Sequence, residues 1–149
     1  MIEEGSEFPA FELPDENGKI WNLSDFEGSK LILYFYPKDD TSGCTAEACE
    51  FRDLMPSIQG GRVVGISPDN AKSHRKFVDK FNLNFTLLSD VDHRLAESLG
   101  LWVEKMLYGR KYMGVERTTF LLDAKGKVLK VWRKVNPQGH AAEVQAALS

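Results

Sequence analysis

The sequence predicts an α/β fold in which helices flank a mixed central sheet. Short apolar stretches with the character of buried strands occur at "LILYFY" (31–36), "RVVGIS" (62–67) and "FTLLS" (85–89). Segments in which apolar residues recur at helical spacing separate these stretches. Because strands that alternate with helices form parallel sheets, the centre of the sheet is expected to be parallel.

The predicted elements follow one another in the order β-α-β-α-β-α-β-β-α. The strands are expected at 31–36, 62–67, 85–89 and twice within 117–132, and the helices at 44–55, 69–82, 91–100 and 137–149. An N-terminal extension, "FELPDENGKIWNL", is expected to add a hairpin. No repeat or linker divides the chain, so residues 1–149 are expected to form one domain with a core of its own.

Local signals justify the later elements in turn. Asp69 and Asn70 are capping candidates at the start of the second helix, and Gly100 is a stop signal at the end of the third. The turn at 123–126 predicts a hairpin, and Pro137 is expected at the start of the last helix. A closing hairpin followed by a helix is the arrangement of a thioredoxin-like fold.

Composition excludes two classes of function. The net charge of −3 arises from 19 basic and 22 acidic residues that are interleaved along the chain, which argues against nucleic-acid binding. The longest apolar run is far too short to cross a bilayer, and the acidic N-terminus lacks a signal pattern. We therefore expect no membrane association and a cytoplasmic location; an organellar one stays open, because a removed transit peptide leaves no trace.

Both cysteines of the chain lie within "DDTSGCTAEAC". Cys44 is expected in the first turn of a helix that begins beyond the C-terminal edge of a central strand, where open α/β sheets place their sites. Backbone N–H groups and the helix dipole favour a thiolate there, and cysteine pKa values fall to roughly 3.5–7.5 in such surroundings. Cys44 is therefore a candidate nucleophile, and its alternative role is that of a small buried apolar residue.

Helix geometry limits what Cys49 can do. Five residues along an intact helix separate two Cα atoms by about 8.6 Å. A disulfide needs about 4.4–6.8 Å, so Cys44 and Cys49 can pair only if the first turns unwind. Packing of Cys49 in the core is the alternative. The three histidines match no zinc-finger spacing and no phosphate-binding loop is present, so no metal or cofactor is predicted.

The stretch "FYPKDDTSGCTAEACEFRD" resembles the peroxiredoxins, whose signature residues correspond to Pro37, Thr41 and Cys44. A second cysteine five residues on, followed by "FRD", is similar to the Q-type subfamily, the bacterioferritin-comigratory proteins. "GSEFPAFELPDENGK" resembles the opening of the family, and "VERTTFLLDAKGKV" resembles its later strand, which carries an active-site arginine, here Arg117. The likeness covers most of the chain. Ser42 departs from it, because many relatives have proline there.

The resemblance implies a thiol peroxidase that reduces hydrogen peroxide and organic hydroperoxides in antioxidant defence and redox homeostasis. Cys44 would become a sulfenic acid, and Cys49 would resolve it as an intramolecular disulfide that a thioredoxin-like protein reduces. A monomer suffices for such a cycle, and a weak dimer stays open. The long segment "LWVEKMLYGRKYMGVER" is similar to the family's variable loop and hairpin. Its lysines and arginines are expected to form a solvated face, and contact with the reductant is their alternative role.

The resemblance also gives each neighbouring residue a role beside an ordinary alternative. Thr41 would align the O–O bond, or simply cap the helix. Pro37 would shield the site from water, or end the strand. Arg117 would stabilise the thiolate and the departing oxygen, or lie on the surface. Glu47 would orient Arg117, or be an exposed helix residue.

Two other functions compete with the peroxidase. A thioredoxin-fold disulfide oxidoreductase or redox sensor would use the Cys44–Cys49 pair on protein thiols. A thioredoxin-fold binding module would leave both cysteines passive. The set Pro37, Thr41 and Arg117 argues against dithiol exchange, because that reaction does not require a peroxide to be aligned.

Overall fold

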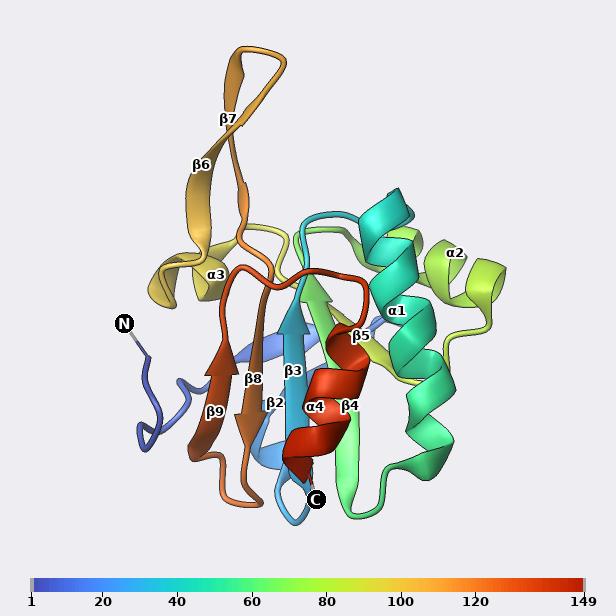
Figure 1. Cartoon of the computed structure of the whole chain (residues 1–149), viewed down its shortest axis with the longest axis vertical. Helices are drawn as coiled ribbons and strands as arrows, with labels where there is room; N and C mark the ends of the chain where they lie inside the picture. Colours follow the sequence, from blue (N-terminus) through green and yellow to red (C-terminus); the bar gives the residue numbers. More distant parts are fainter. Residues whose placement is uncertain (1, 149) are drawn as a thin grey trace.

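A five-stranded mixed sheet forms the centre of the protein, in the order β5-β4-β3-β8-β9 (Figure 1). The computed structural model describes residues 2–148. The central strands are β3 (Lys30–Phe35), β4 (Gly61–Ser67), β5 (Thr86–Ser89), β8 (Thr118–Leu122) and β9 (Val128–Trp132). β3, β4 and β5 are parallel, whereas β8 runs antiparallel to both of its neighbours. The predicted α/β architecture with a parallel centre is confirmed.

Helices and an N-terminal hairpin surround this sheet. The helices are α1 (Ser42–Leu54), α2 (Ala71–Phe81), α3 (Arg94–Ser98) and α4 (His140–Leu148), and two short 3-10 turns cover Leu23–Phe26 and Met55–Ser57. The hairpin predicted at the N-terminus pairs β1 (Glu12–Pro14) with β2 (Ile20–Asn22). Within residues 2–148, no helix has the length and apolar character needed to cross a membrane.

Alternation along β3 divides the core into two layers. Ile32 and Tyr34 point to the face covered by α1, α2 and α4, whereas Leu31, Leu33 and Phe35 point to the face covered by α3 and the N-terminal segment. All five side chains are buried, as the continuous apolar sequence predicts. Because helices pack on both faces of the sheet, the start of α1 is held at the edge of the sheet where β3 ends.

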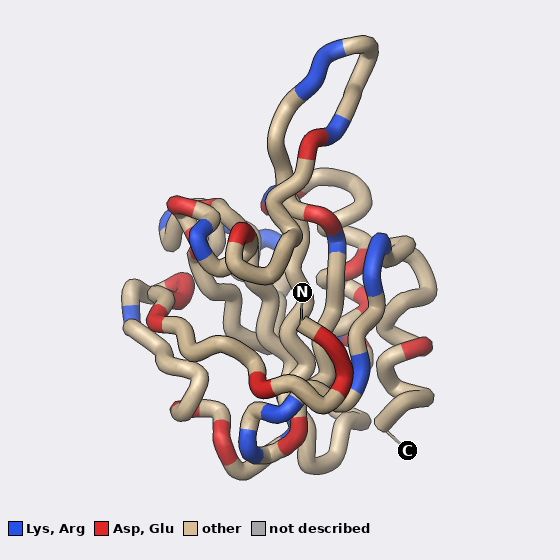
Figure 2. Tube along the Cα trace, turned by 90° about the vertical axis from the view of Figure 1, so that its left-hand side faces the viewer, with Lys and Arg blue, Asp and Glu red and all other residues tan. Residues whose placement is uncertain are grey.

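A second hairpin stands apart from the body of the molecule. It consists of β6 (Trp102–Leu107) and β7 (Arg110–Val115), which pair only with each other. Figures 1 and 2 show it projecting from one end of the molecule, and Figure 1 shows that β3 ends and α1 begins at this end. The hairpin expected ahead of Arg117 is thus present, as an arm.

The boundaries differ from the predicted ones by a few residues. α1 begins at Ser42, two residues earlier than expected, so Cys44 lies inside its first turn. α4 begins at His140, so Pro137 precedes the helix by a short loop and does not start it. β8 begins at Thr118, so Arg117 lies immediately before the strand.

Candidate active site

Cys44 is the third residue of α1 and belongs to the core layer beneath that helix. Its residue is only 1% exposed, and both cysteines are free thiols. The backbone N–H groups of a first helical turn have no intrahelical acceptor, so they favour negative charge at this position. The sulfur is therefore buried in an apolar layer and at the positive end of a helix.

Arg117 joins Cys44 to Glu47. Its Nη2 donates to Cys44 Sγ at 3.3 Å, and its Nη1 donates to Glu47 Oε1 at 2.8 Å. The antiparallel pairing of β8 with β3 brings Arg117 to the edge of the sheet where α1 begins. Burial alone would lower the pKa of Arg117, but the negative charges of Cys44 and Glu47 raise it above its ordinary value. The guanidinium is thus a permanent cation in contact with the sulfur.

Glu47 is a buried carboxylate. Its side chain has no exposure, and burial raises its pKa from 4.5 to about 7, although the charge of Arg117 opposes the shift. Oε2 has no hydrogen-bond partner within the described part of the chain. The alternative of an exposed helix glutamate is therefore wrong, and the pairing with Arg117 is present.

The loop between β9 and α4 packs against the start of α1. A Cβ atom at Gly43 would lie 3.3 Å from Pro137 Cγ and 3.4 Å from Arg117 Nη2. Farther along, the N–H of Gly139 donates to Glu50 Oε1 at 2.9 Å. The sequence predicts Pro137 only as a helix start and has no pattern that indicates this contact. Gly43, beside Cys44, is the one local signal of the close approach.

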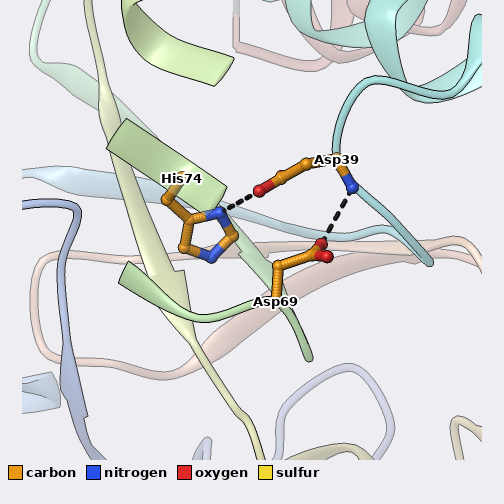
Figure 3. A group of neighbouring side chains, drawn as sticks. All are labelled: Asp39, Asp69 and His74. Atoms are coloured by element: carbon orange, nitrogen blue, oxygen red, sulfur yellow. Dashed lines mark hydrogen bonds and ion pairs between the residues drawn. The ribbon is translucent and has the colours of Figure 1, made fainter. Parts of the chain in front are cut away.

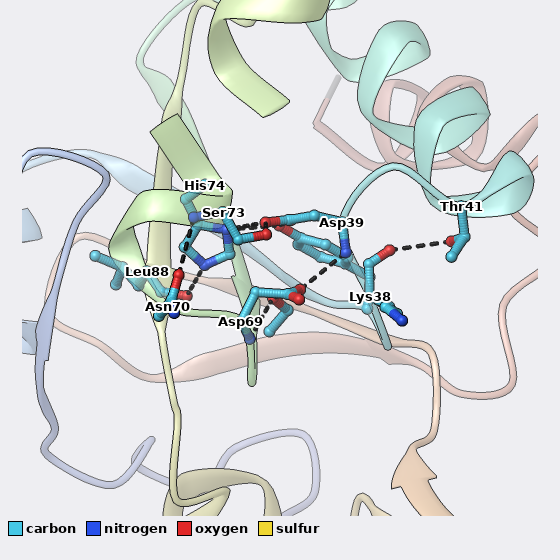
Figure 4. A network of polar contacts seen from close by, with 10 residues as sticks. Lys38, Asp39, Thr41, Asp69, Asn70, Ser73, His74 and Leu88 are labelled. Carbon is cyan, nitrogen blue, oxygen red and sulfur yellow. Dashed lines mark hydrogen bonds and ion pairs between the residues drawn. The ribbon is translucent and has the colours of Figure 1, made fainter. Parts of the chain in front are cut away.

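Thr41 and Pro37 lie in the loop that leads into α1. Thr41 is exposed, and its hydroxyl donates to the Lys38 carbonyl at 3.0 Å (Figure 4). It is the N-cap residue of α1, yet its side chain makes no capping bond. Pro37 is half-buried, two residues beyond β3. Neither residue has a hydrogen bond to Cys44 in the described structure, so their roles in aligning and shielding a peroxide stay predictions.

Cys49 lies farther along the same helix and outside the core. Its side chain is half-exposed, and the core layer contains Cys44, Ala48 and Phe51 but not Cys49. The alternative of a core cysteine is therefore wrong. α1 is continuous through both cysteines, which places their Cα atoms about 8.6 Å apart in an intact helix. The two sulfurs cannot bond in this conformation.

A buried polar network anchors the loop between β3 and α1. Asp39 accepts from the Tyr36 hydroxyl at 2.5 Å, and its other carboxylate oxygen lies 2.7 Å from His74 Nδ1 (Figures 3 and 4). His74 Nε2 lies 3.1 Å from the Leu88 carbonyl, so both ring nitrogens face acceptors. The Asp39 N–H donates to Asp69 Oδ2 at 2.8 Å. The loop is thereby tied to α2 and to the ends of β4 and β5.

The same cluster has the composition of a metal site. One ligand atom from each of Asp39, Asp69 and His74 lies within 4.8 Å of the others. However, Asp39 and His74 are paired with each other, and Asp69 Oδ2 also accepts from the Ser67 hydroxyl at 2.6 Å. Hydrogen bonding therefore accounts for the cluster, and we assign it a structural role.

Lys105, on the arm, is a second cation whose charge interacts with Cys44 and Arg117. Its Nζ donates to the Val115 carbonyl at 2.5 Å. Partial burial lowers its pKa, as does the charge of Arg117, whereas the charge of Cys44 acts in the opposite direction. The sequence does not single out Lys105, because it predicts a solvated face for the basic residues of 101–117.

Comparison with known proteins agrees with this geometry. The model of the AhpC/TSA family matches residues 5–131. The chain is similar to a putative peroxiredoxin Bcp from Coxiella burnetii, with 51% identity over 149 residues and 99% of each chain covered.

Solved structures show the same likeness. A Xanthomonas campestris bacterioferritin comigratory protein, studied for its alkyl peroxide reduction activity, matches with a TM-score of 0.86 and 41% identity over 93% of this chain and 89% of that one. A cysteine-to-serine mutant of Xylella fastidiosa PrxQ matches with a TM-score of 0.93 and 34% identity over 99% of this chain and 96% of that one. The predicted thioredoxin-like architecture is therefore confirmed.

Proposed function

Since the chain belongs to the AhpC/TSA family, as a peroxiredoxin of the Bcp or Q type, it is a peroxidase, and we propose that Cys44 is the residue that reacts with the hydroperoxide. One observation carries the proposal: Arg117 donates at once to the Cys44 sulfur and to the buried Glu47. A passive core cysteine needs no such cation. Dithiol exchange needs no group that stabilises a departing oxygen, so the contact favours the peroxidase over the oxidoreductase or sensor.

The first half-reaction uses the Cys44 thiolate. Sγ attacks the terminal oxygen of the hydroperoxide, the O–O bond breaks, and the remaining oxygen leaves as an alkoxide or hydroxide that takes up a proton. Arg117 stands beside the sulfur, where negative charge passes to the oxygen. Thr41 and Pro37 are proposed to align the peroxide and exclude water, which requires the Thr41 hydroxyl to turn from Lys38.

The second half-reaction requires α1 to open. The Cys49 thiol attacks the sulfenic sulfur of Cys44, a disulfide forms, and water is released. Because the intact helix keeps the two cysteines apart, the first turns unwind and Cys44 leaves the core layer. A dithiol protein of the thioredoxin type then reduces the disulfide and becomes oxidised itself, after which the helix re-forms.

Three broader proposals accompany this cycle. We propose that residues 1–149 act as a single domain, supported by one central sheet whose two faces are both covered. We propose that a monomer is sufficient, because both reacting cysteines belong to one helix. Recycling by a dithiol needs a reducing compartment, which supports an action in the cytoplasm.

Oxidation by one equivalent of hydrogen peroxide tests the two cysteine roles. The reduced protein is expected to lose both thiols rapidly, with a mass decrease of about two hydrogens as the disulfide forms. Cys44→Ser is expected to react no faster than an ordinary thiol. Cys49→Ser is expected to gain one oxygen at Cys44, consume a single equivalent, and stop.

Turnover with thioredoxin completes the test. If Cys49→Ser turned over with thioredoxin at the rate of the parent, the resolving role of Cys49 would be wrong. If Cys44 and Cys49 oxidised equally slowly in the parent protein, the assignment of Cys44 as the peroxide-reacting residue would be overturned.

A further inference from the structure

The β6–β7 arm carries an unusual share of the exposed apolar surface. Among the described residues, eight large hydrophobic side chains are exposed, and five of them are on this arm. They are Met106, Leu107, Tyr108, Tyr112 and Met113, with exposures of 63%, 56%, 95%, 46% and 49%. Tyrosine and methionine are enriched at protein–protein interfaces. A concentration of such side chains on one projecting element indicates a contact surface.

The tip of the arm is strained in a way that points to function. Tyr108 and Gly109 form its two-residue turn, with φ angles of 51° and 77°. Such a turn favours Asn-Gly, because both residues have positive φ. A tyrosine in this conformation costs free energy, and a tyrosine that is 95% exposed recovers nothing by packing within the chain. The strain and the exposure of Tyr108 together favour a role in a contact outside the chain.

The arm is also basic within an acidic protein. Residues 102–115 contain three cations (Lys105, Arg110 and Lys111) and one anion (Glu104), whereas the whole chain has a net charge of −3. Figure 2 shows the basic positions along the arm. A charge of +2 on the arm leaves −5 on the rest of the chain, so the arm is suited to an acidic partner surface.

The root of the arm adjoins the candidate active site in sequence. Val115, the last residue of β7, accepts from Lys105 and is two residues from Arg117, which contacts Cys44. Strands of six residues rise about 20 Å, so the arm stands roughly that far above its root. A domain of about 100 residues has a radius of gyration near 13 Å. Because a protein of that size is wider than the arm is high, one that reaches the oxidised Cys44 has to lie against the arm. A small hydroperoxide does not.

We propose that the β6–β7 arm is the docking surface for the protein reductant, a dithiol protein whose surface around its reactive thiol is apolar and acidic. The proposal rests on the function proposed above. The docked dithiol attacks one sulfur of the Cys44–Cys49 disulfide as a thiolate and forms a mixed disulfide. Its second thiol then displaces the cysteine, so that the partner leaves oxidised and both cysteines leave reduced.

Two substitutions test the arm without touching the catalytic residues. Tyr108→Asn introduces the residue that the turn favours, so the hairpin is retained while the aromatic contact is lost. Leu107→Ser removes an exposed apolar side chain, and Leu129→Ser on β9, where the leucine is 42% exposed, is its matched control. Peroxide turnover is measured with an acidic thioredoxin, with NADPH and thioredoxin reductase, and separately with dithiothreitol.

The arm variants are expected to lose peroxide turnover when thioredoxin is the reductant, but not when dithiothreitol is. Tyr108→Asn and Leu107→Ser are expected to lower kcat/KM for thioredoxin about tenfold, by raising KM. The kcat/KM of the parent for thioredoxin is expected to fall as salt is added, because salt screens the attraction between the basic arm and the acidic partner. Turnover with dithiothreitol and the rate of Cys44 oxidation stay at parent values, and Leu129→Ser behaves as the parent in every assay.

Three results would overturn the proposal. Thioredoxin kinetics unchanged in both arm variants would exclude docking there. An equal loss with dithiothreitol would mean that the arm acts on the chemistry. A parent dimer at assay concentration that dissociates in the variants, with thioredoxin kinetics unchanged, would assign the arm to a second copy of the chain. Failure of the proposed function is distinct, because the parent would then consume no peroxide with either reductant.

Discussion

Glu47 and Arg117 form an ion pair of 2.8 Å in which the carboxylate side chain has no exposure and the guanidinium side chain retains 15%. A buried pair of this kind seldom adds stability, because desolvation offsets the attraction. Its effect here is directional: with Nη1 held by Glu47, Nη2 points to the Cys44 sulfur. The pair therefore positions the cation where a peroxide would react.

Arg117→Lys tests the two-pronged contact. Lysine keeps the charge but cannot donate to Cys44 and Glu47 with a planar fork. The second-order rate constant for Cys44 oxidation by peroxide is expected to fall roughly 10²-fold, as when one preorganised donor is removed from an active site. Rapid mixing with substoichiometric peroxide measures it. Arg94→Lys, at a residue whose side chain is 85% exposed, is the control; an equal loss there, or none at Arg117, would contradict the assignment.

Glu47→Gln tests the cost of the buried carboxylate. Because the pKa of Glu47 is raised from 4.5 to about 7 in the folded protein, its contribution to stability is present below pH 4.5 and is lost as the pH rises through 7. Relative to the parent, the variant is expected to gain about 3 kcal/mol of unfolding free energy between pH 4 and pH 8. Urea unfolding of both proteins at several pH values measures this difference. A difference independent of pH would show that Glu47 does not titrate in this range.

Gly43→Ala tests the close packing at the start of α1. In a helix, alanine is more favourable than glycine by up to about 1 kcal/mol, so the unfolding free energy is not expected to fall. Its Cβ would nevertheless meet Pro137 Cγ at 3.3 Å and Arg117 Nη2 at 3.4 Å. We expect Cys44 oxidation to slow about fivefold through displacement of the guanidinium, and the double variant with Pro137→Ala to recover part of the rate. No recovery would mean that the proline does not hold Arg117 in place.

The sequence predicted the architecture because its signals are local. Continuous apolar strands and helical spacing report which faces are buried, and these patterns placed β3 and α1 within two residues of their observed starts. The pairing of Cys44 with Arg117, 73 residues apart, was accessible only through family resemblance. A lone arginine before a strand has no pattern of its own.

The other contacts around Cys44 depend on where the loops run in the folded chain, and local sequence patterns do not specify this. Pro137 approaches Gly43 because the segment after β9 crosses the start of α1, a matter of tertiary packing. Lys105 reaches the site because the arm returns to the sheet at Val115. Asp39 and His74 are polar residues whose burial is tolerated only because they satisfy each other. In each case the information lies in the contact between distant segments.

Asp39→Asn tests the network beneath the active-site loop. The Asp39 carboxylate accepts hydrogen bonds from the Tyr36 hydroxyl, the His74 ring and the Ser73 hydroxyl. Asparagine offers one acceptor oxygen and turns an amide donor toward groups that donate, so about 1–3 kcal/mol of unfolding free energy is expected to be lost. Asp40→Asn is the matched control, because within the described residues the contact of Asp40 is a surface ion pair with Lys80 at 2.8 Å. This substitution should change the unfolding free energy by less than about 1 kcal/mol. Equal effects in urea unfolding would deny the network a structural role.

Glu50→Ala tests what holds α1 closed before the disulfide forms. Glu50 follows Cys49 directly and accepts the Gly139 N–H at 2.9 Å, so this bond ties α1 to the segment before α4 and helps to keep the helix closed. Losing a hydrogen bond worth about 1 kcal/mol should speed disulfide formation about fivefold after Cys44 has been oxidised. Quenched-flow mass spectrometry, which separates the sulfenic acid from the disulfide, measures this step. Glu50→Gln retains an acceptor and should remain close to the parent.

A matched change on the same helix separates the bond from general helix weakening. Asp53→Ala removes an acidic side chain that is 70% exposed and pairs only with Arg52. It is expected to leave disulfide formation unchanged, and the initial reaction of Cys44 with peroxide should be the same in all three variants. If Glu50→Ala formed the disulfide no faster than Asp53→Ala, opening of α1 would be limited by the departure of Cys44 from the core and not by the contact with Gly139. The comparison separates these two barriers, because the departure of Cys44 from the core does not depend on Glu50, whereas breakage of the bond to Gly139 does.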